Sequence, residues 1–406
     1  MTRLTRSAIW TKQRPRVYLS AAISAIWQFS FLYFAFDKNY ASTLSNVPSE
    51  FTPEGTARTA NGLLIRSFLM RATFLAFCLF LIASVSQAAP KPLQIFFIDV
   101  EGGQSTLFVT PGGQSLLIDT GWAGHEDRDA DRIVAAAKRA HIKKIDYVLI
   151  THYHADHVGG VPQLVDKFPV GTFIDHGENR ETTKTGNRLY ADYLKAIAGH
   201  PRITAKPGDH LPIKGLETVV ISGDGNVIQQ PLPGAGQPNQ YCSGVAKKDL
   251  EPSENDRSLG VVMTFGKLRI VDFGDLTWNK ELQLMCPDNK IGKVDIYVVS
   301  HHGIDWSNDP AFVHGIQPRV AIMDNGAKKG GMPSVWDIIH SSPGLEGLWQ
   351  LHFSDAGGTQ HNSPDAYIAN IADTDTGNYL KVSANQDGSF GIYNSRNKMT
   401  KEYPAK

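Results

Sequence analysis

The sequence has no net charge, few cysteines and no signature of a serine nucleophile or a phosphate-binding loop. Its 406 residues contain 40 lysines and arginines against 40 aspartates and glutamates, which argues against a protein built to coat nucleic acid or acidic membranes. There is no G-x-S-x-G motif and no P-loop. A hydrophobic content of 42% with 20% charged residues excludes a mainly disordered or fibrous chain.

The zero net charge hides two unlike parts of the chain. Residues 1–88 hold nine basic and three acidic residues, whereas residues 89–406 hold 31 and 37, so their net charges are +6 and −6. All 14 histidines lie after residue 88. The acidic second part lacks the basic surface that tight binding of a long polyanion requires.

Residues 70–88 have the anatomy of a secretory signal peptide: a basic start, a short apolar core and a small-residue end. Residues 1–69 admit two explanations. The true start is Met70, which we favour, or residues 17–36 form a membrane anchor that is followed by a linker. Both explanations predict that residues 90–395, as one domain, are exported to the periplasm or secreted, with no stable membrane partner beyond that anchor.

Two cysteines remain once the signal peptide is removed. An oxidising compartment permits a disulfide between Cys242 and Cys286, and two buried free thiols are the alternative. If formed, the bond would close a loop of about 44 residues and stabilise the fold by about 3–4 kcal/mol.

Strand and helix signals alternate through the exported part. Apolar, β-branched runs predict strands at 94–100, 105–109, 115–119, 146–151, 217–222, 259–265, 267–274, 295–300, 319–325 and 349–354. Helical spacing predicts helices at 128–140, 161–168, 188–198, 333–342 and 363–372. Residues 223–257 are rich in Gly, Pro and Gln and are expected to form a long loop. This pattern predicts one mixed α/β domain of about 310 residues, and its two strand-rich halves with helices at similar places suggest a four-layer αββα sandwich.

The strongest functional signal is the run THYHADH at 151–157, directly after an apolar strand. Residues two apart on an extended segment point to the same side, so His152 and His154 can bind one metal ion. The chain then turns, and Asp156 and His157 can reach a second ion. Imidazole and carboxylate ligands suit zinc, manganese or iron.

Two later strands end in similar residues. The strand at 267–274 leads into Asp275, and the strand at 295–300 leads into His301 and His302. Side chains at strand ends are well placed to converge on one site. An oxygen of Asp275 could bridge two metal ions, and one of the two histidines could complete the second site.

Together, HxHxDH followed by Gly-Gly, a strand ending in Gly-Asp and a strand ending in His-His-Gly resemble the metallo-β-lactamase-fold hydrolases. The segments NDRSL (255–259), FGDL (273–276) and VVSHHG (298–303) are similar to the ComEC-type branch, the lactamase-like domain of competence DNA-uptake proteins, and to pneumococcal phosphorylcholine esterase. The resemblance covers about residues 93–370. It implies an αββα sandwich with two divalent metal ions at one edge, zinc or alternatively manganese or iron.

The resemblance also implies a role for each matched residue. The implied ligands are His152 and His154 for the first metal, Asp156, His157 and His302 for the second, and Asp275 as the bridge. Asp119 is implied to orient a ligand, and His301 to contact the ligands or the substrate as a catalytic group. The chain lacks a first-metal histidine near residues 253–257, a feature that the ComEC branch shares. His176 could fill this gap, contact substrate together with Asn255 and Asp256, or simply end a strand.

A two-metal site activates water for attack on a phosphodiester, an ester, a lactone or an amide. We therefore expect a metal-dependent hydrolase of a small phosphodiester or related ester, with Asp156 orienting the nucleophile. Nucleic acid is not favoured as a partner, because the pairs Lys247-Lys248 and Lys328-Lys329 are short and are predicted to be solvated loop charges. The alternatives are a non-hydrolytic metal-binding or iron-dependent redox protein, and a lactone or β-lactam hydrolase.

Overall fold

The computed structural model describes Met70, residues 91–371 and residues 376–406. The chain divides into two compact units, Met1–Ala88 and Ala89–Lys406. The expected anchor at 17–36 and the signal peptide at 70–88 lie outside the described residues, apart from Met70. Among the described residues, no helix combines the length and the apolar character needed to cross a membrane.

The first large sheet has nine strands in the order β19-β18-β17-β1-β2-β3-β4-β5-β6. Pairing is antiparallel from β19 to β3 and parallel from β3 to β6. Its strands are β1 (Leu93–Phe97), β2 (Thr106–Val109), β3 (Ser115–Ile118), β4 (Ile145–Leu149), β5 (Val170–Asp175), β6 (Arg202–Thr204), β17 (Leu380–Ala384), β18 (Phe390–Asn394) and β19 (Thr400–Tyr403).

The second large sheet has eight strands in the order β16-β15-β14-β13-β11-β10-β7-β8. The strands from β11 to β16 are parallel, and the rest pair antiparallel. Its strands are β7 (Glu217–Gly223), β8 (Asn226–Val227), β10 (Gly260–Phe265), β11 (Leu268–Asp272), β13 (Ile296–Val298), β14 (Val320–Met323), β15 (Gly347–His352) and β16 (Ile368–Asn370).

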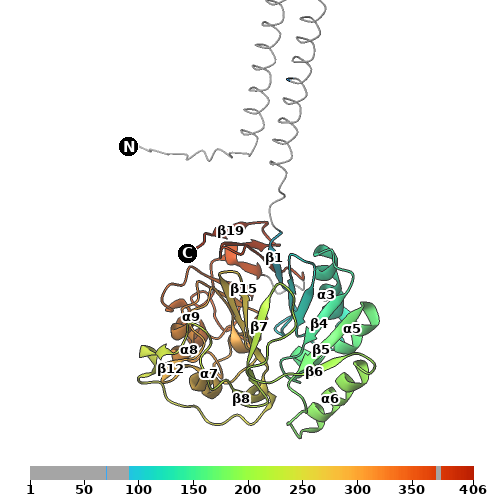
Figure 1. The fold of residues 1–406 in the computed structure, drawn as a ribbon, viewed down its shortest axis with the longest axis horizontal. Helices are drawn as coiled ribbons and strands as arrows, with labels where there is room; N and C mark the ends of the chain where they lie inside the picture. The colour runs from blue at the N-terminus through green and yellow to red at the C-terminus, as the bar shows by residue number, and fades with distance from the viewer. Residues whose placement is uncertain (1–69, 71–90, 372–375) are drawn as a thin grey trace, which may run out of the picture. The chain divides into compact units, whose positions relative to one another are not determined.

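Helices cover the outer face of each sheet, and the two inner faces share one core. On β1, Leu93, Ile95 and Phe97 belong to the apolar cluster between the sheets, whereas Phe96 belongs to the cluster under the first helical layer. Figure 1 shows the helices on opposite sides of the paired sheets. The first layer holds α3 (Arg128–Arg139), α5 (Val161–Lys167) and α6 (Lys184–Ala196); the second holds α7 (Trp278–Met285), α8 (Pro310–Ile316) and α9 (Pro333–His340). The predicted αββα sandwich is confirmed.

The parallel strands of both sheets bring ligand-type residues to one edge of the sandwich. The segment after β4 carries THYHADH, whose last residues form the short helix α4 (Ala155–Val158). Asp275 follows β11, and the turn η5 (Ser300–Gly303) follows β13. At Gly274 the two sheets approach so closely that a Cβ there would lie 2.7 Å from the Cβ of Thr151. This close approach, together with a φ of +53°, requires glycine directly before Asp275.

The segment 223–257 is tied to the body of the domain. It contains β8, β9 (Gln237–Pro238), η3 (Gln240–Cys242) and η4 (Glu254–Arg257). Strand β9 pairs with β12 (Asp288–Asn289), and a disulfide joins Cys242 to Cys286 with a Cα–Cα distance of 5.7 Å. The disulfide closes a loop with a sequence separation of 44 residues.

The prediction of a helix at 363–372 is wrong. The structure has a short turn η6 (Asp365–Tyr367) and then β16, which adds to the open edge of β15 by pairing Gln350 with Ile368. The apolar positions that suggested a helical face are instead a buried strand, and the side chain of Asn370 donates hydrogen bonds to the backbone carbonyls of Leu351 and Asn378. Sheet pairing and backbone capping therefore override the local helical pattern.

Several elements had no strong signal in the sequence. Helices α7 and α8 are short, at eight and seven residues, so each shows barely two turns of periodicity. Strands β17 to β19 were not anticipated, and β19 lies beyond residue 395, where the sequence analysis ended the domain. These three strands extend the first sheet beside β1.

Candidate metal centre

Two groups of buried or half-buried side chains at this edge could each hold a metal ion. The second-metal group consists of Asp156, His157, Asp275 and His302, and the first-metal group consists of His152, His154 and Asp275. Within each group, one ligand atom per residue lies within 4.8 Å of every other. All six residues that the sequence analysis assigned as ligands are therefore brought together, and Asp275 belongs to both groups.

The second-metal group is a compact cage of two imidazoles and two carboxylates. Nε2 of His157 lies 3.2 Å from Oδ2 of Asp156 and 3.3 Å from Oδ1 of Asp275. Nε2 of His302 lies 3.2 Å and 3.5 Å from the same two oxygens, and 3.3 Å from Nε2 of His157. Oδ1 of Asp275 is buried and has no hydrogen-bond partner. Four facing donor atoms at this spacing fit one tetrahedrally bound ion.

The first-metal group is more open. Nε2 of His152 lies 3.0 Å from Nδ1 of His154 and 3.8 Å from Oδ2 of Asp275. The two oxygens of Asp275 are therefore divided between the groups, Oδ1 facing the second and Oδ2 facing the first. This is the geometry expected of a carboxylate that bridges two ions.

Each ligand imidazole has a polar group at its other nitrogen. Nδ1 of His157 lies 2.7 Å from Oδ2 of Asp119, and Nε2 of His154 lies 3.1 Å from Oε2 of Glu181. Nδ1 of His302 faces Oδ1 of Asp324 at 3.5 Å. Nδ1 of His152 lies 3.1 Å from the Thr151 hydroxyl and 3.5 Å from that of Ser258. Such partners fix the ring orientation and the tautomer of a metal-bound histidine.

Even without a metal ion, the carboxylates and imidazoles of the cluster shift one another's pKa values. Burial raises the pKa of Asp275, but the surrounding imidazoles, His157 first, hold this pKa well below its usual range. Burial lowers the pKa of His302, yet Asp275 and Asp324 bring it to about 9. Carboxylates likewise raise the pKa of His157 despite its burial. A metal ion that binds here must therefore displace protons from these imidazoles.

His301 lies beside the bridging carboxylate but belongs to neither metal group. Its Nε2 is 3.4 Å from Oδ2 of Asp275, and its Nδ1 is 3.3 Å from the hydroxyl of Ser307. Burial lowers its pKa to about 4, so the imidazole is neutral at pH 7. It therefore offers an uncharged hydrogen-bonding group on the first-metal side.

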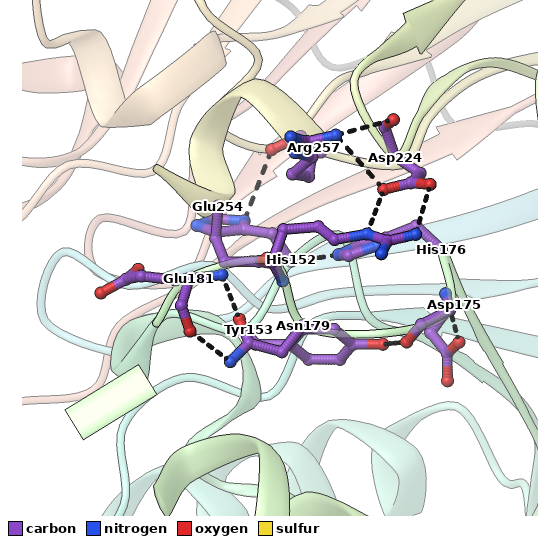
Figure 2. Close-up of polar contacts among 12 residues, drawn as sticks. His152, Tyr153, Asp175, His176, Asn179, Glu181, Asp224, Glu254 and Arg257 are labelled. Carbon is purple, nitrogen blue, oxygen red and sulfur yellow. Dashed lines mark hydrogen bonds and ion pairs between the residues drawn. The ribbon is translucent and has the colours of Figure 1, made fainter. Parts of the chain in front are cut away.

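His176 does not fill the gap in the first-metal group. It is buried, its Nε2 lies 2.9 Å from Oε2 of Glu254, and its ring packs against Tyr153. Glu254 also accepts a hydrogen bond from the backbone amide of Arg180. Figure 2 shows this network, in which His176 and Glu254 lie beside His152 and Tyr153. His176 thus packs against the histidine loop through Tyr153.

The other two expected substrate contacts are also engaged within the protein. Asn255 donates to Oε1 of Glu251, and its own Oδ1 is buried without a partner. Asp256 accepts from the hydroxyl of Thr277 and lies 3.5 Å from Nζ of Lys280. Neither residue belongs to a metal group in the described part of the chain.

The sequence analysis missed several residues at the site. Glu181 precedes α6 and Asp324 follows β14, and neither has a motif that marks it. Lys329 was predicted to be solvated, but its ammonium contacts Oδ2 of Asp156. Lys248 was also expected to be solvated, but it donates to the carbonyl of Asp305 and lies 4.0 Å from the Trp278 ring centroid. The only local signal for Asp324 is its acidic side chain near the end of the strand predicted at 319–325.

A third group of potential ligands is internally neutralised. Nε2 of His352 lies 2.7 Å from Oδ1 of Asp99, and Arg132 lies 3.1 Å from the other oxygen. Glu101 completes this group. Because the arginine and the histidine already balance the buried carboxylate, the group forms a charge network rather than a vacant cation site.

Comparison with known proteins supports the superfamily that the motifs suggested. Residues 99–238 match the family model described as the metallo-beta-lactamase superfamily. This segment includes the histidine run but ends before Asp275 and His302. The match, the two-sheet architecture and the candidate ligand groups agree with one another.

Similar curated proteins have diverse names. The chain is 25% identical over 246 residues to the ComE operon protein 3 of Bacillus subtilis, covering 57% of this chain and 28% of that protein. It is 27% identical over 159 residues to a hydroxyacylglutathione hydrolase of Stenotrophomonas maltophilia, covering 36% and 56%. It is 33% identical over 88 residues to an atrochrysone carboxyl ACP thioesterase of Emericella nidulans, covering 22% and 28%. The chain spans from about a quarter to just over half the length of these relatives.

Proposed function

We propose that this chain is an exported hydrolase that uses two divalent metal ions, zinc first, to cleave a small phosphodiester or a related ester. The observation that carries the proposal is the division of the two Asp275 oxygens between two ligand groups. Export is supported by the signal-like sequence at 70–88 and by the disulfide between Cys242 and Cys286, which suits an oxidising compartment.

The residues fit the metals that the superfamily implies. The donor set consists of imidazole nitrogens and carboxylate oxygens, and the buried Oδ1 of Asp275 has no hydrogen-bond partner, which leaves it able to bind a cation. Bound there, metal ions would supply Lewis acidity, which lowers the pKa of water and stabilises negative charge on the displaced group. Asp119 and Glu181 would hold the imidazoles of His157 and His154 in place, and Asp324 faces the imidazole of His302 at 3.5 Å.

The remaining groups act on the substrate and the nucleophile. Asp156 lies at the mouth of the second-metal group, where its carboxylate can orient the attacking water by accepting a hydrogen bond. The neutral His301 stands on the first-metal side, where it can hydrogen-bond to a substrate oxygen or receive a proton. These two side chains flank the bridging carboxylate.

A small substrate is easier to accommodate than a long nucleic acid. The unit at 89–406 carries a net charge of −6, which opposes a polyanion. None of the six candidate ligands lines the cleft formed by Lys247, Lys248, Asp249, Glu251, Thr277, Trp278, Asn279, Asp305 and Trp306, but Thr277 and Asp305 follow Asp275 and His302 by two and three residues in the chain. The resemblance of residues 255–259, 273–276 and 298–303 to the ComEC-type branch favours a phosphodiester among the ester substrates.

The proposal is tested by hydrolysis of bis(p-nitrophenyl) phosphate and of p-nitrophenyl acetate by purified protein loaded with Zn²⁺ or Mn²⁺. We expect turnover of the phosphodiester that disappears with chelator and in Asp275→Asn, while the exposed-site variant Asp131→Asn keeps it. Metal content is measured on every sample. A protein that binds two ions per chain but cleaves neither substrate would contradict the hydrolase proposal.

A redox protein is the second candidate, because the same nitrogen and oxygen donors also suit iron. Thiolates are missing from both ligand groups, so the donor set does not single out zinc. Dioxygen consumption by iron-loaded protein, in the absence of ester turnover, would favour this candidate over hydrolysis.

A further inference from the structure

We propose that Lys329 recognises a negatively charged group on the substrate, so that the site selects anionic esters over neutral ones. The inference rests on the proposed hydrolase function and names the substrate class of the same site. It starts from the position of Lys329. The sequence pattern predicted a solvated loop charge, but the structure places this side chain in contact with Asp156.

The backbone around Lys329 is fixed to the metal-ligand turn. The amide of Gly331 donates to the carbonyl of His302 at 2.9 Å, and the amide of Met332 donates to the carbonyl of Gly303 at 3.0 Å. At Gly330, a Cβ would lie 2.0 Å from the His302 carbonyl oxygen, so only glycine fits there. The position of Lys329 beside His302 is therefore set by the fold rather than by a free loop.

The side chain of Lys329 runs from this anchored backbone to the rim of the cluster. Its Nζ lies 5.1 Å from the ring centroid of Trp122 and contacts Oδ2 of Asp156. The lysine side chain is 30% exposed, whereas that of Asp156 is 10% exposed. The ammonium thus occupies the boundary between the buried ligands and solvent, where a substrate must enter.

The carboxylate of Asp156 cannot at the same time neutralise Lys329 and bind a metal ion through the same oxygen. The same Oδ2 that contacts Lys329 lies 3.2 Å from Nε2 of both His157 and His302, and so faces the centre of the second-metal group. When Asp156 acts as a metal ligand, its charge is committed to that ion. The ammonium is then left without this carboxylate at the rim, where it lies 5.1 Å from the ring centroid of Trp122 in a cation–π contact. An anionic group of the substrate can take the place of the carboxylate.

Lys328 provides a matched control. It is the adjacent lysine, it is exposed, and its removal changes the net charge of the protein by the same amount. The experiment compares wild type, Lys329→Met, Lys329→Arg and Lys328→Met, each loaded with Zn²⁺ or Mn²⁺ and assayed for metal content. Two measurements follow: kcat and KM for bis(p-nitrophenyl) phosphate and p-nitrophenyl acetate, and the Kd of inorganic phosphate by titration calorimetry.

We expect Lys329→Met to keep its metals, to raise KM for the anionic diester by about tenfold or more, and to leave KM for the neutral ester within about twofold. Phosphate binding should weaken by a similar factor, Lys329→Arg should retain most of it, and Lys328→Met should match wild type. Equal losses for both substrates, loss of metal from Lys329→Met, or an unchanged phosphate Kd would overturn the proposal. If wild type cleaves neither substrate, the proposed function fails, and the phosphate titration still decides the role of Lys329.

Discussion

Nδ1 of His157 lies 2.7 Å from Oδ2 of Asp119, and both side chains are completely buried. Asp119 also accepts hydrogen bonds from the amide and the hydroxyl of Thr151, so its carboxylate is fixed on three sides. Burial raises the pKa of this carboxyl, although His157 and Thr151 oppose that rise. The pair determines which nitrogen of His157 faces the second-metal group.

Asp119→Asn should weaken binding of the second metal by about 10–100-fold. The amide keeps the shape of the carboxylate but removes the negative charge that orients and polarises His157. Metal affinity is measured by competition with a chromophoric chelator. The surface variant Asp131→Asn on α3 serves as control, and equal affinities in the two variants would contradict the assigned role of Asp119.

Glu181→Gln should selectively weaken the first-metal site. Oε2 of Glu181 lies 3.1 Å from Nε2 of His154, while Nδ1 of that ring faces His152. Loss of the carboxylate frees the ring to rotate, and we expect about one ion per chain to be retained at metal concentrations that fill both sites in wild type. The neighbouring Glu178, whose side chain is 79% exposed, provides the control Glu178→Gln. Loss of both ions would instead indicate a general structural defect.

The convergence of the six candidate ligands could be predicted because their signal is local. His152, His154, Asp156 and His157 lie within six residues after an apolar run, and Asp275 and His302 follow further apolar runs. A buried strand that ends in a polar side chain can be recognised from the sequence alone, because its residues are consecutive. The alternation of strands and helices predicted a mixed α/β domain, and the resemblance to the metallo-β-lactamase fold implied its four layers.

The residues that support the ligands could not be predicted in the same way. Glu181 reaches His154 across 27 positions within the half built on the first sheet, and Lys329 reaches Asp156 across 173 positions from the second sheet to the first, so neither contact is set by the local sequence. The strand at 368–370 could not be predicted either, because it forms by pairing with β15, and the sequence does not show that β15 has a free edge. Long-range contacts of this kind leave no periodic pattern.

Replacing both Cys242 and Cys286 by serine should lower the free energy of unfolding by about 3–4 kcal/mol, because the 44-residue loop is then no longer closed in the unfolded chain. Metal content should be unchanged, since neither cysteine belongs to a ligand group. Chemical denaturation with and without reductant measures the effect. Reductant should lower the free energy of unfolding of wild type but leave that of the double variant unchanged. A double variant as stable as oxidised wild type would show that the bond does not stabilise the fold.

Titration of Glu281 should make the free energy of unfolding depend on pH. This residue on α7 is completely buried, and its Oε2 accepts a hydrogen bond from the amide of Asp309. Burial, reinforced by the nearby Asp309 carboxylate, raises its pKa from 4.5 to about 8. Between these values the folded protein holds a proton that the unfolded protein has released. Stability must therefore fall as pH rises through this window, by up to about 1.4 kcal/mol per pH unit from this group.

Glu281→Gln should remove that contribution. The amide oxygen can still accept the hydrogen bond from Asp309, and the side chain is neutral in both folded and unfolded states at every pH. We therefore expect the variant to gain stability relative to wild type as pH rises from 5 to 8, with no further relative change above pH 8. Urea denaturation of both proteins at half-unit pH steps measures the difference, with Glu178→Gln as the exposed control. Parallel stability curves for Glu281→Gln and wild type would mean that Glu281 titrates alike in the folded and unfolded chains.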